Sequence, residues 1–243
     1  MRDVLFEFPE PSLNATFIRR PQRFLVEMRL QDNSNIVAYC ANSGSMDGNL
    51  REGQRALIWD SADASRKRRF TWRAFEWEDV WVGVDTHLSN RIIEKALLLK
   101  CLPGLDTYDF IRKEVVLEKG VRIDFVLSGV GGECWVEVKS VNTVKNGVAR
   151  YPDSITPRGV NQLRALTSRV MEGRRCIVVF LIQRGDAESF QISQMHHKKY
   201  AEALDVAVAA GVEIMPLTVS VCNEGFGFPR IIRFDKNDNK RFF

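Results

Sequence analysis

Two neighbouring segments in the middle of the chain alternate apolar and charged side chains with the period of a β-strand, which limits them to strands of a sheet with two unlike faces. The segments are residues 121–127 and 135–140. The expected apolar face carries Ile123, Phe125, Leu127, Val136 and Val138, and the expected charged face carries Asp124, Glu137 and Lys139. This pattern predicts adjacent strands that present two acids and a lysine together.

The elements around these strands predict an α/β fold for the second part of the chain. A strand-like stretch at 112–117 precedes them, and turns containing Gly120 and Gly131–Gly132 join the three into a meander. Helices are expected from Ser89, from Thr156 and near 195–210, with strands at 176–182 and 212–221. The order helix, three strands, helix, strand, helix, strand favours a mixed sheet flanked by helices.

The first part of the chain has a different texture. Its short apolar segments, at 24–30, 36–40, 56–59 and 80–84, are separated by glycines, which is typical of a small antiparallel barrel or sandwich. We therefore expect a two-domain α/β protein, with domains at 1–84 and 85–243.

The strand register predicts how close the acids lie. If the loop at 128–133 closes symmetrically, Asp124 lies opposite Glu137, and the hairpin around Lys119 places Glu114 beside Asp124. Acids opposite one another destabilise a sheet unless something compensates, and Mg²⁺ or Mn²⁺ prefers such oxygen ligands. We expect a metal site at Asp124, Glu137 and Glu114, and Lys139 completes a catalytic set suited to phosphodiester hydrolysis.

A plainer interpretation of the same side chains is a solvated sheet face. An acid and a lysine two residues apart on a strand are common, and only the surrounding helix, strands and second acid make the metal site the better interpretation.

Basic and aromatic side chains gather in the first domain. Cations contact phosphates and aromatic rings stack on bases, so these residues predict a nucleic-acid surface, whereas the alternative is a solvated charged loop with core aromatics. The predicted nucleic-acid-binding residues are Arg19, Arg20, Arg23, Arg66, Lys67, Arg68, Arg69, Phe70 and Trp72. Binding of this kind would be salt-sensitive and weakly sequence-specific.

Several segments together resemble the sugar fermentation stimulation protein family, SfsA. The segments are RFLVE from Arg23, ANSGSM from Ala41, KRRFTW from Lys67, VDTHLSNR from Val84, RIDFVL from Arg122, WVEVKSV from Trp135 and YPDSITPRG from Tyr151. The resemblance implies an OB-like, basic nucleic-acid-binding domain followed by a PD-(D/E)XK nuclease-like domain, and an association with DNA and with control of sugar utilisation. It places Asp124, Glu137 and Lys139 on the nuclease motif, with Glu114 and Glu94 on accompanying acidic positions.

Two further segments have simpler interpretations. Residues 42–48 are typical of a tight turn, and 156–159 of a helix start whose Arg158 could meet a phosphate. The net charge of +4 permits a polyanionic partner, and the lack of an apolar signal core or long apolar run predicts a cytoplasmic protein without a membrane partner.

Three functions follow from the sequence. The first is a DNA-binding regulator linked to sugar utilisation, with a nuclease-like divalent-metal site that need not turn over. The alternative is an active Mg²⁺- or Mn²⁺-dependent nuclease. A small-molecule sensor has no pocket signature in its favour, and the oligomeric state, including a homodimer, stays open.

Overall fold

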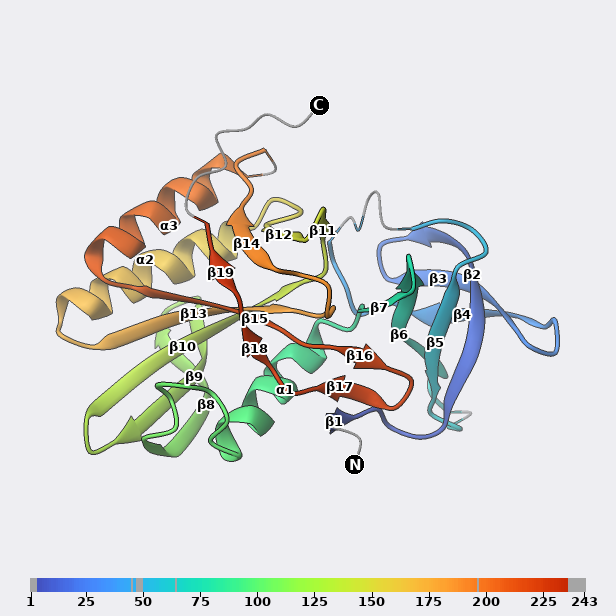
Figure 1. Cartoon of the computed structure of the whole chain (residues 1–243), viewed down its shortest axis with the longest axis horizontal. Helices are drawn as coiled ribbons and strands as arrows, with labels where there is room; N and C mark the ends of the chain where they lie inside the picture. The colour runs from blue at the N-terminus through green and yellow to red at the C-terminus, as the bar shows by residue number, and fades with distance from the viewer. Residues whose placement is uncertain (1–3, 45, 47–49, 64, 196, 236–243) are drawn as a thin grey trace.

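The structure, a computed structural model, describes residues 4–44, 46, 50–63, 65–195 and 197–235. Two units lie side by side, a small barrel and a larger unit that combines a sheet with helices (Figure 1). The chain passes from the first to the second at residues 84–86. This arrangement confirms the predicted two-domain α/β fold class.

The first unit is a closed barrel. Its strands follow the order β4-β3-β2-β5-β6-β7, and parallel pairing of Ala38 with Phe70 and of Tyr39 with Thr71 joins β4 to β6 and closes the ring. The strands are β2 (Ser12–Gln22), β3 (Leu25–Leu30), β4 (Asn35–Tyr39), β5 (Arg55–Asp60), β6 (Phe70–Trp77) and β7 (Val80–Gly83). Alternate side chains point inward and fill the barrel, with Trp72 and Phe75 the largest of them.

A mixed sheet forms the centre of the second unit. Its order is β18-β15-β13-β10-β9-β8, in which β10, β13 and β15 run parallel and β8, β9 and β10 form the predicted antiparallel meander. The strands are β8 (Tyr108–Glu118), β9 (Val121–Gly129), β10 (Gly132–Val141), β13 (Arg175–Ile182), β15 (Glu213–Thr218) and β18 (Arg230–Ile231).

Helices cover both faces of this sheet. Helix α1 (His87–Leu98) packs on one face, where Ile92 joins a core with Phe125 and Val136. Helices α2 (Pro157–Met171) and α3 (Lys198–Ala210) pack on the other face through Leu163 and Leu204. The plainer interpretation of the charged side chains as a solvated sheet face is therefore wrong, because Asp124, Glu137 and Lys139 are nearly buried on the side that α2 covers.

The expected sharing of faces holds for four of the five apolar side chains. Phe125, Leu127, Val136 and Val138 lie in the core on the α1 side, whereas Ile123 lies in the core on the α2 side. The change of face coincides with Asp124, and Glu114 on the neighbouring strand has a φ of +54°. The residue pattern does not reveal this change of face, and the register of β8 with β9 stays continuous across it.

The N-terminal strand belongs to the second unit, although it precedes the barrel in the sequence. Strand β1 (Val4–Glu7) pairs with β17 (Gly225–Gly227), which also pairs with β16 (Val221–Cys222). Leu5 and Phe8 thereby enter the same core as α1. Gly225 has a φ of +154°, and a Cβ there would lie 2.0 Å from the Phe6 carbonyl oxygen, so this close pairing requires glycine.

A small sheet lies beside the junction of the two units. It consists of β11 (Val144–Lys145), β12 (Val148–Tyr151), β14 (Ser189–Ile192) and β19 (Arg233–Phe234). The turn expected at 42–48 approaches it, but Ser45 and residues 47–49 lie outside the described residues. Within the described ranges, no helix is long and apolar enough to cross a membrane.

Candidate functional site

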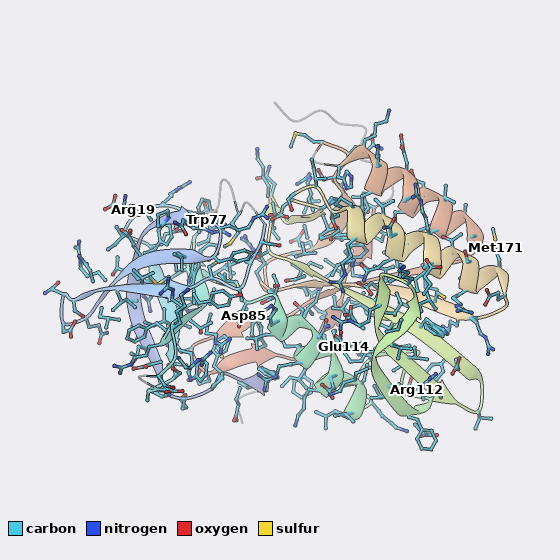
Figure 2. All side chains as sticks on the ribbon, turned by 180° about the vertical axis from the view of Figure 1, so that it is seen from behind. Arg19, Trp77, Asp85, Arg112, Glu114 and Met171 are labelled. Carbon is cyan, nitrogen blue, oxygen red and sulfur yellow. The ribbon has the colours of Figure 1, made fainter. Side chains whose placement is uncertain are left out.

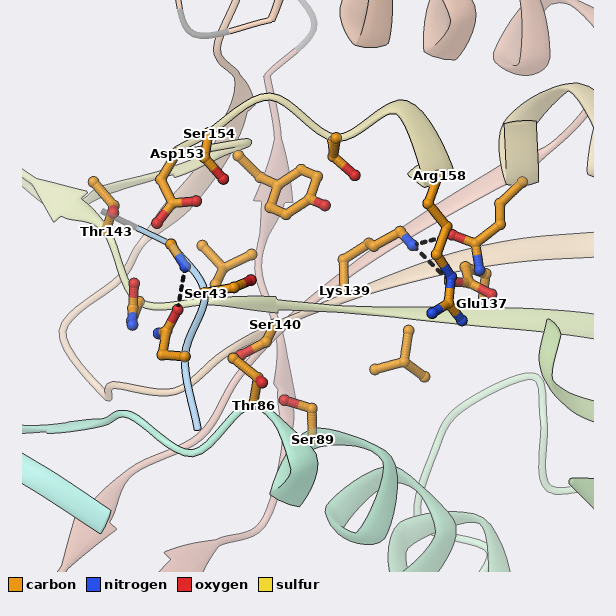
Figure 3. A pocket seen from close by; sticks show the side chains of 18 of the residues that line it. Ser43, Thr86, Ser89, Glu137, Lys139, Ser140, Thr143, Asp153, Ser154 and Arg158 are labelled. Carbon is orange, nitrogen blue, oxygen red and sulfur yellow. Dashed lines mark hydrogen bonds and ion pairs between the residues drawn. The ribbon is translucent and has the colours of Figure 1, made fainter. Parts of the chain in front are cut away.

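A pocket of about 370 Å³ lies where the barrel meets the second unit, and we call it the junction pocket. Residues 42–44 of the barrel form one wall, the start of α1 and the end of β10 form the floor, and the segment before α2 forms the opposite wall (Figure 3). Of the predicted site residues, Asp124, Glu137 and Lys139 line it. The structure therefore brings three of the four predicted catalytic residues into one cavity.

Asp124 is held in place by two neighbouring elements. It is 9% exposed, its Oδ2 accepts a hydrogen bond from the Val138 backbone nitrogen at 2.7 Å, and its Oδ1 accepts one from Asn90 Nδ2 at 2.8 Å. Asn90 belongs to α1, so the helix and strand β10 together fix this carboxylate. Each oxygen still has a lone pair available for another ligand.

Glu137 and Lys139 form a buried ion pair. Lys139 Nζ donates to Glu137 Oε1 at 2.5 Å and to Gln162 Oε1 at 2.7 Å (Figure 3). Glu137 is only 3% exposed, and its Oε2 has no hydrogen-bond partner among the described residues. A buried carboxylate oxygen without a hydrogen-bond partner destabilises the folded state, so this atom is a candidate for binding a ligand.

Burial gives the Glu137 carboxyl an unusual pKa. Burial raises the pKa of the Glu137 carboxyl from its ordinary value of 4.5 to about 7, because the charged form loses hydration; the nearby Lys139 opposes this shift and Asp124 adds to it. For Lys139, burial acts to lower the pKa, but the neighbouring Glu137 and Tyr151 raise it above 10.5. Lys139 is therefore a cation at neutral pH, whereas Glu137 lies near its midpoint.

Two amide side chains complete the site without having been predicted. Gln162 is 2% exposed on α2, accepts from Lys139 and donates through Nε2 to the Arg122 carbonyl oxygen at 3.0 Å. Asn90 orients Asp124. One sequence signal points to Gln162, because it lies on the apolar stripe of α2 between Val160 and Leu163.

The expected register is confirmed for the pairs that the structure records. Cys134 pairs with Leu127 and Val136 with Phe125, which continues the numbering that sets Glu137 against Asp124. On the other hairpin, Lys113 pairs with Phe125 and Val115 with Ile123.

Glu114, however, does not reach the junction pocket, although the register places its backbone beside Asp124. Its positive φ turns the side chain away, and its Oε2 lies 2.6 Å from Arg122 Nε with 48% of the side chain exposed. Glu94 is also elsewhere, paired with Lys113 at 2.8 Å. The structure therefore does not bring the Glu114 side chain to the other predicted site residues, because register fixes the backbone of a residue but not the direction of its side chain.

The predicted metal site contains two acidic side chains. Across the described part of the chain, no group of three or more His, Cys, Asp or Glu side chains is arranged to hold a metal ion. Asp124 and Glu137 are the acids that share the predicted centre. Mg²⁺ accepts such an environment, since it is commonly bound by one or two carboxylates while waters and substrate phosphates complete its octahedron.

The two aromatic residues of the predicted nucleic-acid surface pack into or against the barrel core. Trp72 is completely buried in the barrel core and donates to the Ala74 carbonyl oxygen at 2.9 Å, so the expectation that it stacks on bases is wrong. Phe70 packs against the same core. A large aromatic side chain on a barrel strand stabilises the fold more when it is buried in the core than when it is exposed, because it removes a large apolar area from water.

Several of the predicted arginines already have partners. Arg69 pairs with Asp60 at 2.5 Å, Arg19 pairs with Glu27 at 2.7 Å, and Arg20 donates to the carbonyl oxygens of Asn42 and Gly44. Figure 2 shows Arg19 at the outer end of the barrel, away from Asp85 at the junction. Arg19, Arg23, Arg66, Lys67 and Arg69 are all exposed, with Arg68 half-buried, but Arg19 and Arg69 are engaged by acids.

Comparison with known families matches both units of the chain. The family described as "Sugar fermentation stimulation protein RE domain" matches residues 87–225, and "SfsA N-terminal OB domain" matches residues 18–84.

Individual relatives extend over nearly the whole chain. A sugar fermentation stimulation protein homolog of Pelobacter propionicus is 38% identical over 88% of this chain and 93% of its own length, and one of Syntrophobacter fumaroxidans is 38% identical over 94% and 87%. A solved structure of Pyrococcus furiosus SfsA in complex with Ca²⁺ superposes with a TM-score of 0.87 at 26% identity, covering 96% of this chain and 99% of that one. The chain belongs to the sugar fermentation stimulation protein family.

Proposed function

We propose that this protein binds DNA and hydrolyses its phosphodiester bonds at the junction pocket with the help of Mg²⁺ or Mn²⁺. The observation that carries the proposal is the buried Oε2 of Glu137, which has no partner among the described residues and lies in one cavity with Asp124 and Lys139. A divalent cation would neutralise the two carboxylates and supply that partner. The pair of acids plus a lysine is also the arrangement that the nuclease-like resemblance implies.

The residues present fit a hard divalent cation. Asp124 and Glu137 would hold it, and the polar lining of the pocket leaves room for water and phosphate oxygens. The Pyrococcus furiosus relative is described in complex with Ca²⁺, another cation that takes oxygen ligands. When bound, such an ion supplies charge stabilisation of the phosphate and lowers the pKa of a bound water.

The protein's own groups would divide the remaining work. Lys139 is the cation nearest the acids, so its Nζ would stabilise charge on the scissile phosphate. Gln162 fixes Lys139, while Asn90 and the Val138 backbone nitrogen fix Asp124. These contacts hold the catalytic side chains before substrate arrives, which reduces the cost of reaching the reactive geometry.

The test is hydrolysis of labelled DNA in the presence of Mg²⁺ or Mn²⁺. We expect Lys139→Ala to lower the rate by roughly 10²–10³-fold, the usual cost of removing one charge-stabilising donor. The matched control is Lys199→Ala, because Lys199 is exposed on α3. Since Lys139→Ala leaves a buried acid without its partner, Asp124→Asn provides a second variant with little change in shape. Hydrolysis that is absent with every cation in wild type, or equal in all these proteins, would refute the proposal.

A second function is a DNA-binding regulator linked to sugar utilisation that uses the same pocket without turnover. The exposed cations Arg66 and Lys67 on the barrel favour it, because they could contact phosphates irrespective of base sequence. Tight binding of DNA by a wild-type protein that leaves the DNA intact under all cations would select this function over hydrolysis.

A further inference from the structure

Arg158 connects the junction pocket with a second hollow. The second hollow has a volume of about 290 Å³ and lies beside the β8–β9 hairpin. Its lining consists of Val116, Glu118, Gly120, Val121, Arg122 and Arg158. Arg158 also lines the junction pocket, so the two cavities adjoin at this side chain.

The Arg158 side chain is available for a ligand. It is exposed, and among the described residues no hydrogen bond or ion pair engages it. By contrast, Arg122 in the same hollow is paired with Glu114 at 2.6 Å. Figure 3 shows the Arg158 guanidinium directed toward Glu137, and its charge acts on the Glu137 carboxyl by lowering its pKa against the larger effect of burial.

The backbone that carries Arg158 is fixed. Thr156 Oγ1 accepts a hydrogen bond from the Gly159 backbone nitrogen at 3.2 Å and caps α2. Gly159 also packs against Tyr200, where an added Cβ would lie 2.9 Å from the ring. The backbone at Arg158 is therefore fixed at the start of α2, beside the acids, while its exposed side chain remains open to a ligand.

The depth of the site favours one strand of nucleic acid over a duplex. Glu137 is 3% exposed and the side chain of Lys139 is 11% exposed, so a phosphate must enter the pocket to meet them. The barrel narrows the approach, because at Gly44 a Cβ would lie 2.1 Å from Asp153 Oδ2 of the facing wall. An unpaired strand can bend into such a cleft, whereas a duplex is stiff over the length of a site.

We propose that the junction pocket and the second hollow together hold one unpaired DNA strand, and that Arg158 binds the phosphate next to the scissile one. The proposal rests on the proposed function for the identity of the ligand and adds the strandedness of the substrate and a positioning residue. The strand passes from residues 42–44 over Glu137 and Lys139 and continues beside Arg158 toward β8–β9. Arg158 acts on orientation and affinity, while Lys139 acts on the reacting phosphate.

Binding measured without turnover tests this proposal. A fluorescent oligodeoxynucleotide of about 16 nucleotides, the upper end of typical single-strand site sizes, is titrated in EDTA at several salt concentrations, as a single strand and as a hairpin duplex. We expect tighter binding of the single strand. Arg158→Gln should reduce the slope of log affinity against log salt by about 0.7, the value for one phosphate contact on a single strand.

The matched control is Arg164→Gln, because Arg164 is exposed on the same helix and lines neither cavity. An unchanged slope in Arg158→Gln, an equal change in Arg164→Gln, duplex binding as tight as single-strand binding, or no binding by wild type would each overturn the proposal. The outcome is independent of catalysis. A slope that changes as expected in a protein that never hydrolyses DNA refutes the proposed hydrolysis alone, and hydrolysis with an unchanged slope refutes the role of Arg158 alone.

Discussion

The junction pocket and the basic surface of the barrel are both rich in charge, but they differ in how the charges are held. In the pocket, Asp124, Glu137 and Lys139 are nearly buried and fixed by contacts from three elements, and one carboxylate oxygen still has no partner among the described residues. On the barrel, Arg19 and Arg69 are exposed and neutralised by nearby acids. Burying charged groups, as in the pocket, reduces the stability of the fold, and such groups cluster at functional sites.

This contrast shows which sequence signals carry functional information. Side chains that alternate on paired strands must converge, because the pleat directs them to the same side of the sheet. A cluster of arginines has no such constraint, and several of those on the barrel pair with a nearby acid or backbone carbonyl instead of converging. Convergence from distant segments is therefore better evidence of a site than the local density of charge.

The largest effect is expected from Trp72, whose role differs most from the predicted one. Because its side chain fills the barrel core, Trp72→Ala should lower the free energy of unfolding by about 3–5 kcal/mol. Urea unfolding measures this change. Trp72→Phe keeps most of the buried ring and should leave DNA affinity unaltered. Reduced affinity in Trp72→Phe with normal stability would mean that the ring contacts bases after all and that the barrel surface is a site of the same kind as the pocket.

A second prediction concerns the pH dependence of stability, which the pocket imposes and the barrel arginines do not. Burial raises the pKa of Glu137 to about 7, so between pH 4.5 and 7 the folded state holds a proton that the unfolded state has released. The contribution of this group to stability is complete below pH 4.5 and is lost as pH rises through 7. The amount is on the order of 3 kcal/mol, from about 1.4 kcal/mol for each pKa unit.

Urea unfolding in EDTA across this pH range compares wild type with Glu137→Gln. The variant lacks the titrating group, so its stability should fall less steeply between pH 4.5 and 7, whatever constant offset the unpaired Lys139 adds. Adding Mg²⁺ above pH 7 should stabilise wild type by about 2.7 kcal/mol at a hundredfold excess over the dissociation constant, and Glu137→Gln by less. Parallel pH curves for the two proteins would contradict the assignment of the raised pKa to Glu137.

Much of the fold was predictable because its signals are local. The alternation in Leu25–Leu30 and the apolar run of β13 reflect burial, which periodicity reports directly. The pairing of β1 with β17 was not predictable, since it joins segments more than two hundred residues apart and nothing in Val4–Glu7 specifies its partner. The order of the six-stranded sheet is likewise decided by tertiary packing.

The residues of the site also separate into those that local sequence signals predict and those that depend on tertiary packing. Asp124, Glu137 and Lys139 were predictable because strand spacing and hairpin length determine their neighbours. Glu114 was misplaced because a positive φ redirects one side chain without altering the register. Gln162 reaches Lys139 and Asn90 reaches Asp124 from helices, and the distance of both amides from the strands depends on how α1 and α2 pack. Sequence periodicity contains no information on that packing.

The smallest effect is expected from the exposed cations of the barrel, and it would show whether they bind DNA. If the exposed Arg66 and Lys67 and the half-buried Arg68 bind DNA phosphates, replacing all three by glutamine should reduce the slope of log affinity against log salt, by about 1 for each duplex phosphate that the variant no longer neutralises. Arg69→Gln is the matched control, because its charge is already paired with Asp60 and should contribute little. Anisotropy titrations with one duplex at several salt concentrations measure both slopes. An unchanged slope in the triple variant would leave the junction pocket as the DNA-binding region and reduce the barrel arginines to solubilising charges, whereas an equal change in Arg69→Gln would show that DNA can compete with Asp60 for this side chain.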